Sequence, residues 1–361
     1  MILSLTPPYE TGPYRPPNEA KSLLIRVTRN CKWNRCAFCP LYKGESYEER
    51  PVEEILKDVD AAAVFYQAIG IIPETAFLQD AEPLALKTPD LVRVLQRIRE
   101  RFPDIQRITA YARSATLANK PVDEWREIHE AGLTRIHRGL ETGYDSLLRY
   151  MEKGATARTH IIGGQRIKQA GIELSDYVMP GLGGNLELEP GKPTWEQHAK
   201  ETALVLNEVN PDYIRLRTLV IPPDAPLAKK EAEEGYRRLS DPDIIREIRL
   251  FLETLEVTGT ELDSGHIINV LREVGGRLPQ DKKKMIATLD RYLTMSPEDQ
   301  IFFRLGVLLG YFHSDMPKFH TLDQFYAFGL FRTVKQKSSL VLQKMGIGSE
   351  ECIDELLRRA V

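Results

Sequence analysis

The segment Leu23–Leu41 reads LLIRVTRNCKWNRCAFCPL, and the fold of the whole chain can be predicted outward from it. Its first residues, Leu23–Val27, are β-branched and leucine-rich, which is typical of a strand buried in a parallel sheet. The strand leads into a loop that carries Cys31, Cys36 and Cys39, three of the four cysteines in the chain. Because free cysteine is rare, three thiols on one short loop indicate a metal site.

The kind of metal follows from the number of ligands on this segment, residues 31–39, which we call the cysteine loop. A structural zinc site needs four protein ligands, yet the next histidine is His129 and the remaining cysteine is Cys352. A disulfide would leave one thiol unpaired, and we find no signal peptide that would direct the chain to an oxidising compartment. A cubic iron–sulfur cluster is held by thiolates, and three of them leave one iron open for a substrate or cofactor. A cluster is therefore favoured, with zinc as the alternative.

The cysteine loop resembles the cluster loop of the radical S-adenosylmethionine (radical SAM) enzymes. A strand is followed by Cys31-x4-Cys36-x2-Cys39, with the aromatic Phe38 before the last cysteine. The first gap is four residues here, whereas three are usual in that superfamily. The resemblance implies a [4Fe-4S] cluster on the three cysteines, with S-adenosylmethionine on the open iron and Phe38 lining its adenine pocket. Reductive cleavage would then yield a 5′-deoxyadenosyl radical that takes a hydrogen atom from the substrate.

Composition sets broad limits on the rest of the chain. The 361 residues are enough for one large domain or a domain with an appendage, and 42% hydrophobic and 28% charged residues are ordinary for a globular protein. The formal charge of -3 gives no electrostatic case for binding nucleic acid. Because no apolar run reaches the length of a membrane span, we expect a cytoplasmic enzyme without a membrane partner. The cluster that the resemblance implies also predicts an oxygen-sensitive enzyme.

Strands and helices alternate after the cysteine loop. Apolar residues at helical spacing predict helices, and short β-branched runs predict strands between them. Six strand–helix repeats in order predict an α/β fold, a partial (β/α)6 TIM-like barrel whose site lies at the carboxyl ends of the strands. The expected helices are 52–67, 90–102, 122–131, 159–170 and 195–209, with 241–255 after the sixth strand, and the expected strands after the first are 75–78, 105–112, 133–141, 172–184 and 213–221.

Two of these strand ends carry polar residues that suit the cofactor. The second strand runs into Gln79, Asp80 and Glu82 in the sequence QDAEP. It resembles the family's Gly-Gly-Glu-Pro loop, which holds the methionine amino group of S-adenosylmethionine, although the glycines are missing. A solvated turn is the alternative. The third strand ends at Ser114, which we also expect to bind cofactor.

A second strong resemblance lies in residues 137–156, HRGLETGYDSLLRYMEKGAT. This stretch is similar to the G-L-E-[ST]-G…L…M-x-K-G segment of the coproporphyrinogen-oxidase, methylthiotransferase and elongator branches. The resemblance places Glu141 at the fourth strand's end, near the cofactor's methionine or ribose, with a capping role as the alternative. In the same way MPGLGG, residues 179–184, resembles the end of the family's fifth strand, so Met179 and Gly181 are expected beside the adenine.

The sixth strand carries Arg215 and Arg217 two residues apart, so both should point to one face. They are candidates for a carboxylate on cofactor or substrate, and structural pairing is the alternative. After a polar turn, His266 either caps a helix or reaches the barrel mouth as a substrate contact or proton donor.

The expected organisation is an extended, proline-rich arm over residues 1–20, a radical SAM core over 21–235, and a mainly helical extension over 236–361 that caps the barrel. No residue is assigned a catalytic role. Because the extra domains of the methylthiotransferase and elongator branches are missing, we expect a small-molecule substrate, with a reducing partner such as flavodoxin or ferredoxin. The alternative is a non-catalytic iron–sulfur or zinc-binding protein on a similar barrel.

Overall fold

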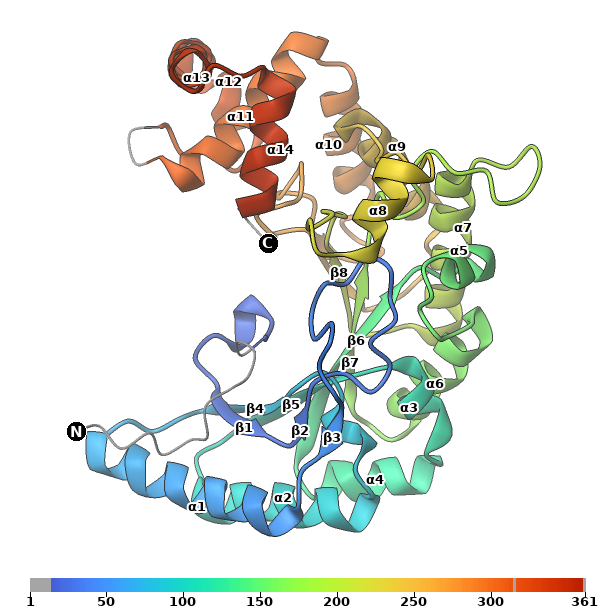
Figure 1. Ribbon diagram of the computed structural model, residues 1–361, viewed down its shortest axis with the longest axis vertical. Coiled ribbons are helices and arrows are strands. Elements are labelled where there is room, and N and C mark those ends of the chain that lie inside the picture. Colours follow the sequence, from blue (N-terminus) through green and yellow to red (C-terminus); the bar gives the residue numbers. More distant parts are fainter. Residues whose placement is uncertain (1–13, 314–315, 360–361) are drawn as a thin grey trace. The chain divides into compact units, whose positions relative to one another are not determined.

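The computed structural model describes residues 14–313 and 316–359 (Figure 1). The chain divides into two compact units. Residues up to 140 and 152–177 form the first unit, while residues 141–151 and those from 178 onward form the second.

The first unit is built on parallel strands in chain order. Strand β1 (Leu23–Arg26) pairs with β4 (Thr75–Gln79), β4 with β5 (Arg107–Ala112), and β5 with β6 (Leu133–Glu141), all in parallel, and β7 (Glu173–Val178) comes next. Their side chains are almost fully buried, as a parallel sheet requires. The helices between the strands are α1 (Val52–Ile69), α2 (Thr88–Arg101), α3 (Ser114–Asn119), α4 (Val122–Glu130) and α6 (Ala157–Gln169).

Short elements complete the first unit. Strands β2 (Thr28–Arg29) and β3 (Glu48–Glu49) form an antiparallel pair around the cysteine loop, and η2 (Pro83–Ala85) is a single 3-10 turn. Most of the predicted N-terminal arm, residues 1–13, lies outside the described residues. Its last part contains one 3-10 turn, η1 (Pro17–Glu19), whose buried Glu19 carboxylate accepts a hydrogen bond from Ser22 at 2.6 Å.

The second unit holds three short strands and most of the helices. Strand β8 (Tyr213–Leu216) runs parallel to β9 (Glu261–Asp263), and β9 is antiparallel to β10 (Gly276–Arg277). Among the C-terminal helices, α11 contacts both α13 and α14 (Figure 1). The helical elements are α5 (Asp145–Tyr150), α7 (Thr194–Val209), α8 (Pro226–Glu233), α9 (Asp241–Thr254), α10 (Lys282–Leu293), α11 (Pro297–Phe312), α12 (Leu322–Tyr326), η3 (Ala327–Gly329), α13 (Leu330–Met345) and α14 (Ser349–Arg359).

The predicted fold class is confirmed. The chain is a mixed α/β protein with mostly parallel strands, and β1, β4, β5, β6, β7 and β8 alternate with helices as in a partial (β/α)6 TIM-like barrel with a helical C-terminal extension. Within the described residues, no helix combines the length and the apolar composition needed to cross a membrane.

Two local predictions beyond β7 are wrong. The sixth strand ends at Leu216 rather than Ile221, because the Thr218 N–H donates to the Asn269 side chain at 2.9 Å instead of to a neighbouring strand. The helix expected after His266 does not form. The Asn269 amide instead donates to the carbonyls of Leu216 and Ser264, at 2.8 and 2.9 Å, so a buried side chain holds this segment as a series of turns.

Candidate functional site

The cysteine loop follows directly from strand β1. Asn30 and Asn34 adopt positive φ angles of 63° and 48°, which turn the backbone sharply on either side of Cys31. All three thiols of the loop are partly exposed. Burial, together with the nearby Cys36 and Cys31, raises the pKa of Cys39 to about 11. The three thiols therefore lie within electrostatic reach of one another on one loop.

The donor set of the loop fits an iron–sulfur cluster. Among the described residues, no three Cys, His, Asp or Glu side chains converge as ligands of a single metal ion. A cubane cluster takes each of three thiolates on a separate iron, and the loop supplies three cysteines. Because a cluster is held by thiolates, its binding releases the proton that the partly buried Cys39 thiol carries.

Asp80 fixes the entrance of the loop. Its carboxylate is only 2% exposed and pairs with Arg26 at 2.9 Å. The backbone N–H of Asn30, the residue before Cys31, donates to the same carboxylate oxygen at 2.9 Å. Asp80, predicted as a cofactor residue, thus also holds the start of the cysteine loop in place. Gln79, the residue before it, is fully buried at the end of β4 and accepts a hydrogen bond from the Val27 N–H at 2.6 Å.

Trp33 fixes the middle of the loop against a remote part of the first unit. Its indole N–H donates to the Glu152 carbonyl at 2.6 Å. The guanidinium groups of Arg35 and Arg113 lie 5.2 and 5.1 Å from its ring centroid. Gly154, with φ of +67°, packs against the same ring so closely that a Cβ there would lie 2.4 Å from it. The loop therefore rests on the MEKG segment, residues 151–154.

Lys153 of the MEKG segment lies close to Phe38, the predicted adenine contact. The Lys153 ammonium lies 5.6 Å from the ring centroid of Phe38, whose side chain is 9% exposed. Sequence reasoning noted the MEKG pattern but missed Trp33, Arg113 and Lys153. The sequence feature that could have pointed to this contact is Trp33 itself, an aromatic residue between Cys31 and Cys36.

Glu82 and Ser114 are both buried in the first unit. Glu82 accepts hydrogen bonds from the Thr116 hydroxyl and, at 3.4 Å, from Arg113. The Ser114 hydroxyl shares a hydrogen bond of 2.6 Å with His160, whose pKa is held well below its ordinary value by burial and the Arg138 charge. Both predicted residues are thus ordered by protein partners at the start of helix α3.

In the second unit, two predicted motifs meet at their backbones. Glu141 adopts a positive φ of 66°, and its carbonyl accepts a hydrogen bond from the Met179 N–H at 3.0 Å. The buried His198 joins the same two turns, since its Nε2–H donates to the Met179 carbonyl at 3.1 Å and its Nδ1 accepts from the Thr142 hydroxyl at 2.8 Å. This histidine, missed at the sequence level, ties the GLETG turn to the MPGLGG turn.

A buried carboxyl group supports the MPGLGG turn as well. Glu247 of helix α9 accepts a hydrogen bond from the Gly181 N–H at 2.9 Å. Its Oε1 also lies 3.4 Å from Nε2 of His198. Burial raises the pKa of Glu247 to about 8 and lowers that of His198 to about 4, so both side chains are neutral near pH 7 despite their ion-pair distance.

The two arginines of the sixth strand differ in their surroundings. Arg215 pairs with Asp263 of β9 at 2.8 Å, which agrees with the structural alternative for this residue. Arg217 is exposed and has no carboxylate partner among the described residues. The half-buried His266 lies within electrostatic reach of Arg217.

The structure therefore brings the predicted residues together in two groups. The cysteine loop lies with the end of β4 and with helix α3 in the first unit. The ends of β6 and β7 lie together in the second. The first group contains Cys31, Cys36, Phe38, Cys39, Gln79, Asp80, Glu82 and Ser114, and the second contains Glu141, Met179 and Gly181.

Residues 25–189 match the model of the Radical SAM superfamily. Over this region, a little under half of the 361 residues, the chain is similar to that superfamily. The matched region begins in strand β1, includes the whole cysteine loop and ends beyond the MPGLGG turn. Enzymes of the superfamily use a [4Fe-4S] cluster and S-adenosylmethionine.

Curated relatives match parts of the chain. The chain is 26% identical over 181 residues to 4′-phospho-dehydrooxetanocin synthase of Priestia megaterium, a match over 45% of this chain and 24% of that protein. It is 24% identical over 208 residues to the heme chaperone HemW of Buchnera aphidicola subsp. Schizaphis graminum, over 55% of this chain and 50% of HemW. The chain thus spans between a quarter and a half of these relatives.

A solved structure shows the same fold. Coproporphyrinogen III oxidase (HemN) from Escherichia coli aligns with 64% of this chain and 52% of its own, with a TM-score of 0.50 and 16% sequence identity. Since the identity is low, the likeness concerns the arrangement of strands and helices alone.

Proposed function

We propose that this chain is a radical SAM enzyme acting on a small molecule. The observation that carries the proposal is a loop of three thiols at the carboxyl end of the first strand, inside the region that matches the superfamily. When bound, a [4Fe-4S] cluster and S-adenosylmethionine supply one-electron chemistry, in which reductive cleavage gives a 5′-deoxyadenosyl radical that abstracts hydrogen from the substrate.

The chain's own residues bind and orient these groups. Cys31, Cys36 and Cys39 hold the cluster as thiolates. Asp80 and Trp33 keep the cysteine loop in one conformation, since the first binds the loop's entrance and the second its middle. Such fixed outer contacts orient the ligands of a metal centre.

The proposed contacts to S-adenosylmethionine are those that the family resemblance implies, residue by residue. Phe38 lines the adenine pocket, the loop with Gln79, Asp80 and Glu82 faces the methionine amino group, and Ser114 lies beside it. Glu141 approaches the methionine or ribose, with Met179 and Gly181 at the adenine. Arg217 faces a carboxylate, either of the cofactor or of the substrate. The buried supports of Glu82 and of the MPGLGG turn favour preformed geometry.

The proposal implies two further partners. Reductive cleavage needs an electron donor, for which flavodoxin or ferredoxin is suited. The substrate is proposed to be small, because the net charge of -3 offers no general attraction for nucleic acid. Free thiols and an oxygen-sensitive cluster suit a reducing compartment, which we propose to be the cytoplasm.

The test is anaerobic. The protein is reconstituted with iron and sulfide, reduced with dithionite and given S-adenosylmethionine, and 5′-deoxyadenosine is measured by mass spectrometry. We expect the nucleoside from the intact protein and none from Cys36→Ala. A complete four-iron signal without any 5′-deoxyadenosine, even after addition of a small-molecule cell extract, would favour the non-catalytic alternative.

A further inference from the structure

Three basic side chains of the second unit follow the carboxyl ends of two paired strands. Strands β8 and β9 run parallel, with Arg215 opposite Asp263. Arg217 follows the end of β8, and His266 follows the end of β9. In α/β folds this edge of the sheet is where ligands bind. We propose that Arg217, His266 and Arg272 form a subsite for an anionic group, a carboxylate or a phosphate, of the substrate.

Arg217 offers a cation that the described residues do not neutralise. Its backbone is fixed, because its N–H donates to the Val178 carbonyl at 2.9 Å, while its side chain is exposed. Arg215 shows the contrast, since its guanidinium pairs with Asp263 at 2.8 Å. The other oxygen of Asp263 accepts from the Gly265 N–H at 2.8 Å.

Arg272 is held in place by neutral groups. Its Nε–H donates to the Gly265 carbonyl at 2.9 Å, and its Nη1 donates to Nδ1 of His320 at 3.0 Å. The guanidinium also lies 4.8 Å from the ring centroid of Tyr311. Among residues 14–313 and 316–359, no carboxylate lies within ion-pair distance of Arg272. The side chain is thus ordered while its charge stays available.

His266 lies within the field of both arginines. Burial lowers the pKa of His266 most, and the charges of Arg217 and Arg272 lower it further, to about 4. The Asp263 charge opposes these effects only in part. The imidazole is therefore neutral near pH 7. Its Nδ1 accepts from the Ile268 N–H at 3.4 Å, which leaves Nε2–H as a donor.

An anion is the ligand class that this arrangement favours. Both guanidinium groups act on His266, and neither has a carboxylate within ion-pair distance among the described residues, although Asp263 acts on Arg272 from further away. A carboxylate or phosphate placed between them would accept charge-assisted hydrogen bonds. This inference rests on the proposed function, because only an enzyme has a substrate to which the anionic group could belong. The anion itself has two possible sources, an acidic group of the substrate and the carboxylate of S-adenosylmethionine.

The experiment separates these sources with inorganic phosphate as the probe. Phosphate is titrated into the full-length protein without cluster, and the imidazole C2–H signal of His266, assigned with His266→Gln, is followed by NMR. We expect saturable shifts in the wild type and affinity weakened about tenfold or more in Arg272→Gln and Arg217→Gln. Arg246→Gln, an exposed arginine of helix α9, is the matched control and should bind phosphate as the wild type does.

The second arm measures S-adenosylmethionine affinity by equilibrium dialysis on the reconstituted protein. Unchanged affinity in Arg272→Gln supports a substrate subsite, whereas a loss equal to that for phosphate would assign the anion to the cofactor and overturn the proposal. Phosphate affinity that neither arginine variant changes would also overturn it. If Arg272→Gln does not fold, Arg217→Gln and Arg272→Lys serve in both arms. The phosphate arm needs no cluster or turnover, so its failure is distinct from a failure of the proposed function.

Discussion

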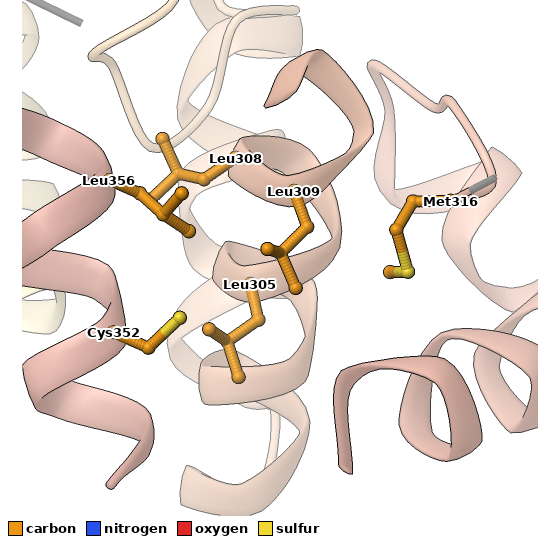
Figure 2. Packing of buried hydrophobic residues seen from close by; sticks show 6 residues of the cluster. All are labelled: Leu305, Leu308, Leu309, Met316, Cys352 and Leu356. Atoms are coloured by element: carbon orange, nitrogen blue, oxygen red, sulfur yellow. The ribbon is translucent and has the colours of Figure 1, made fainter. Parts of the chain in front are cut away.

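At the scale of single residues, the four cysteines have different surroundings. Cys31, Cys36 and Cys39 are partly exposed on one loop, whereas Cys352 is fully buried. Figure 2 shows Cys352 on helix α14 facing leucines of α11, with Met316 at the edge of the same apolar cluster. A thiol packed this way acts as a small apolar group.

We therefore expect opposite results from two alanine variants. Cys36→Ala removes a proposed cluster ligand and should reduce bound iron, and the absorbance of the reconstituted cluster, to background. Cys352→Ala should keep both and lower the free energy of unfolding by only about 1 kcal/mol, because it leaves a small cavity. Iron analysis and thermal melting measure these effects. Full iron in Cys36→Ala would contradict the assignment of the ligands.

Gly154 supplies a second prediction at this scale. A Cβ at this position would lie 2.4 Å from Trp33, and the positive φ adds backbone strain. Gly154→Ala should therefore lower both the melting temperature and the iron retained after gel filtration. Gly70→Ala is the matched control, since Gly70 has the same φ of +67° and open space around it. It should cost about 1 kcal/mol in stability and retain its iron; equal iron loss in both variants would argue against the Trp33 support.

At the scale of elements, the turns after β6 and β7 depend on buried side chains of helices α7 and α9. His198 and Glu247 are neutral where they hold the MPGLGG turn. In the folded protein the pKa of Glu247 is about 8, above its ordinary 4.5. Its contribution to the free energy of unfolding therefore falls as the pH rises over that range. Folded His198 has a pKa of about 4, below its ordinary 6.5, so its contribution falls as pH drops.

The two effects give a defined pH window. Between the ordinary pKa of Glu and that of His, the stability changes caused by Glu247 and by His198 have opposite signs. Above about pH 6.5 only the change caused by Glu247 continues. We expect the wild type to lose roughly 2 kcal/mol of stability between about pH 6.5 and 8. Glu247→Gln should remove this slope, because a neutral amide still accepts from Gly181, and Glu253→Gln on the same helix should retain it. Melting curves across this range test the prediction; a slope unchanged in Glu247→Gln would refute it.

At the scale of the whole molecule, the cysteine loop and its supports belong to the first unit alone. The loop contacts Asp80 at the end of β4 and residues 152–154, all within that unit. Helices α11, α13 and α14 pack around a separate apolar cluster of the second unit. Each unit therefore has internal contacts that can respond separately to a ligand.

This separation predicts where a bound cluster stabilises the chain. Loading the cluster should slow amide hydrogen exchange in peptides that cover residues 27–50, 79–82 and 151–154, because these segments share the fixed loop. Peptides of α11 and α14 should exchange as before. Hydrogen-exchange mass spectrometry of the apo and reconstituted protein measures both sets. Equal protection of α11 and α14 would show that the units respond as one.

What the sequence determined by itself was the order of elements and the chemistry of one loop. Buried strands and amphipathic helices carry their pattern in neighbouring residues, so the bounds of β6, Leu133–Glu141, could be predicted in full. The three clustered thiols and the GLETG and MEKG segments are likewise local. Predictions weakened where local pattern competes with distant partners, as at the end of β8.

Only the tertiary structure decided which distant residues support the site. Trp33 meets Glu152, Asn30 meets Asp80, and His198 joins Thr142 to Met179, all across many residues of chain. A buried polar side chain gains its role from the group that satisfies its hydrogen bonds, and that group is selected by folding rather than by sequence spacing. For the same reason, the sequence could list Arg215 and Arg217 as equals, while the fold pairs only the first with Asp263.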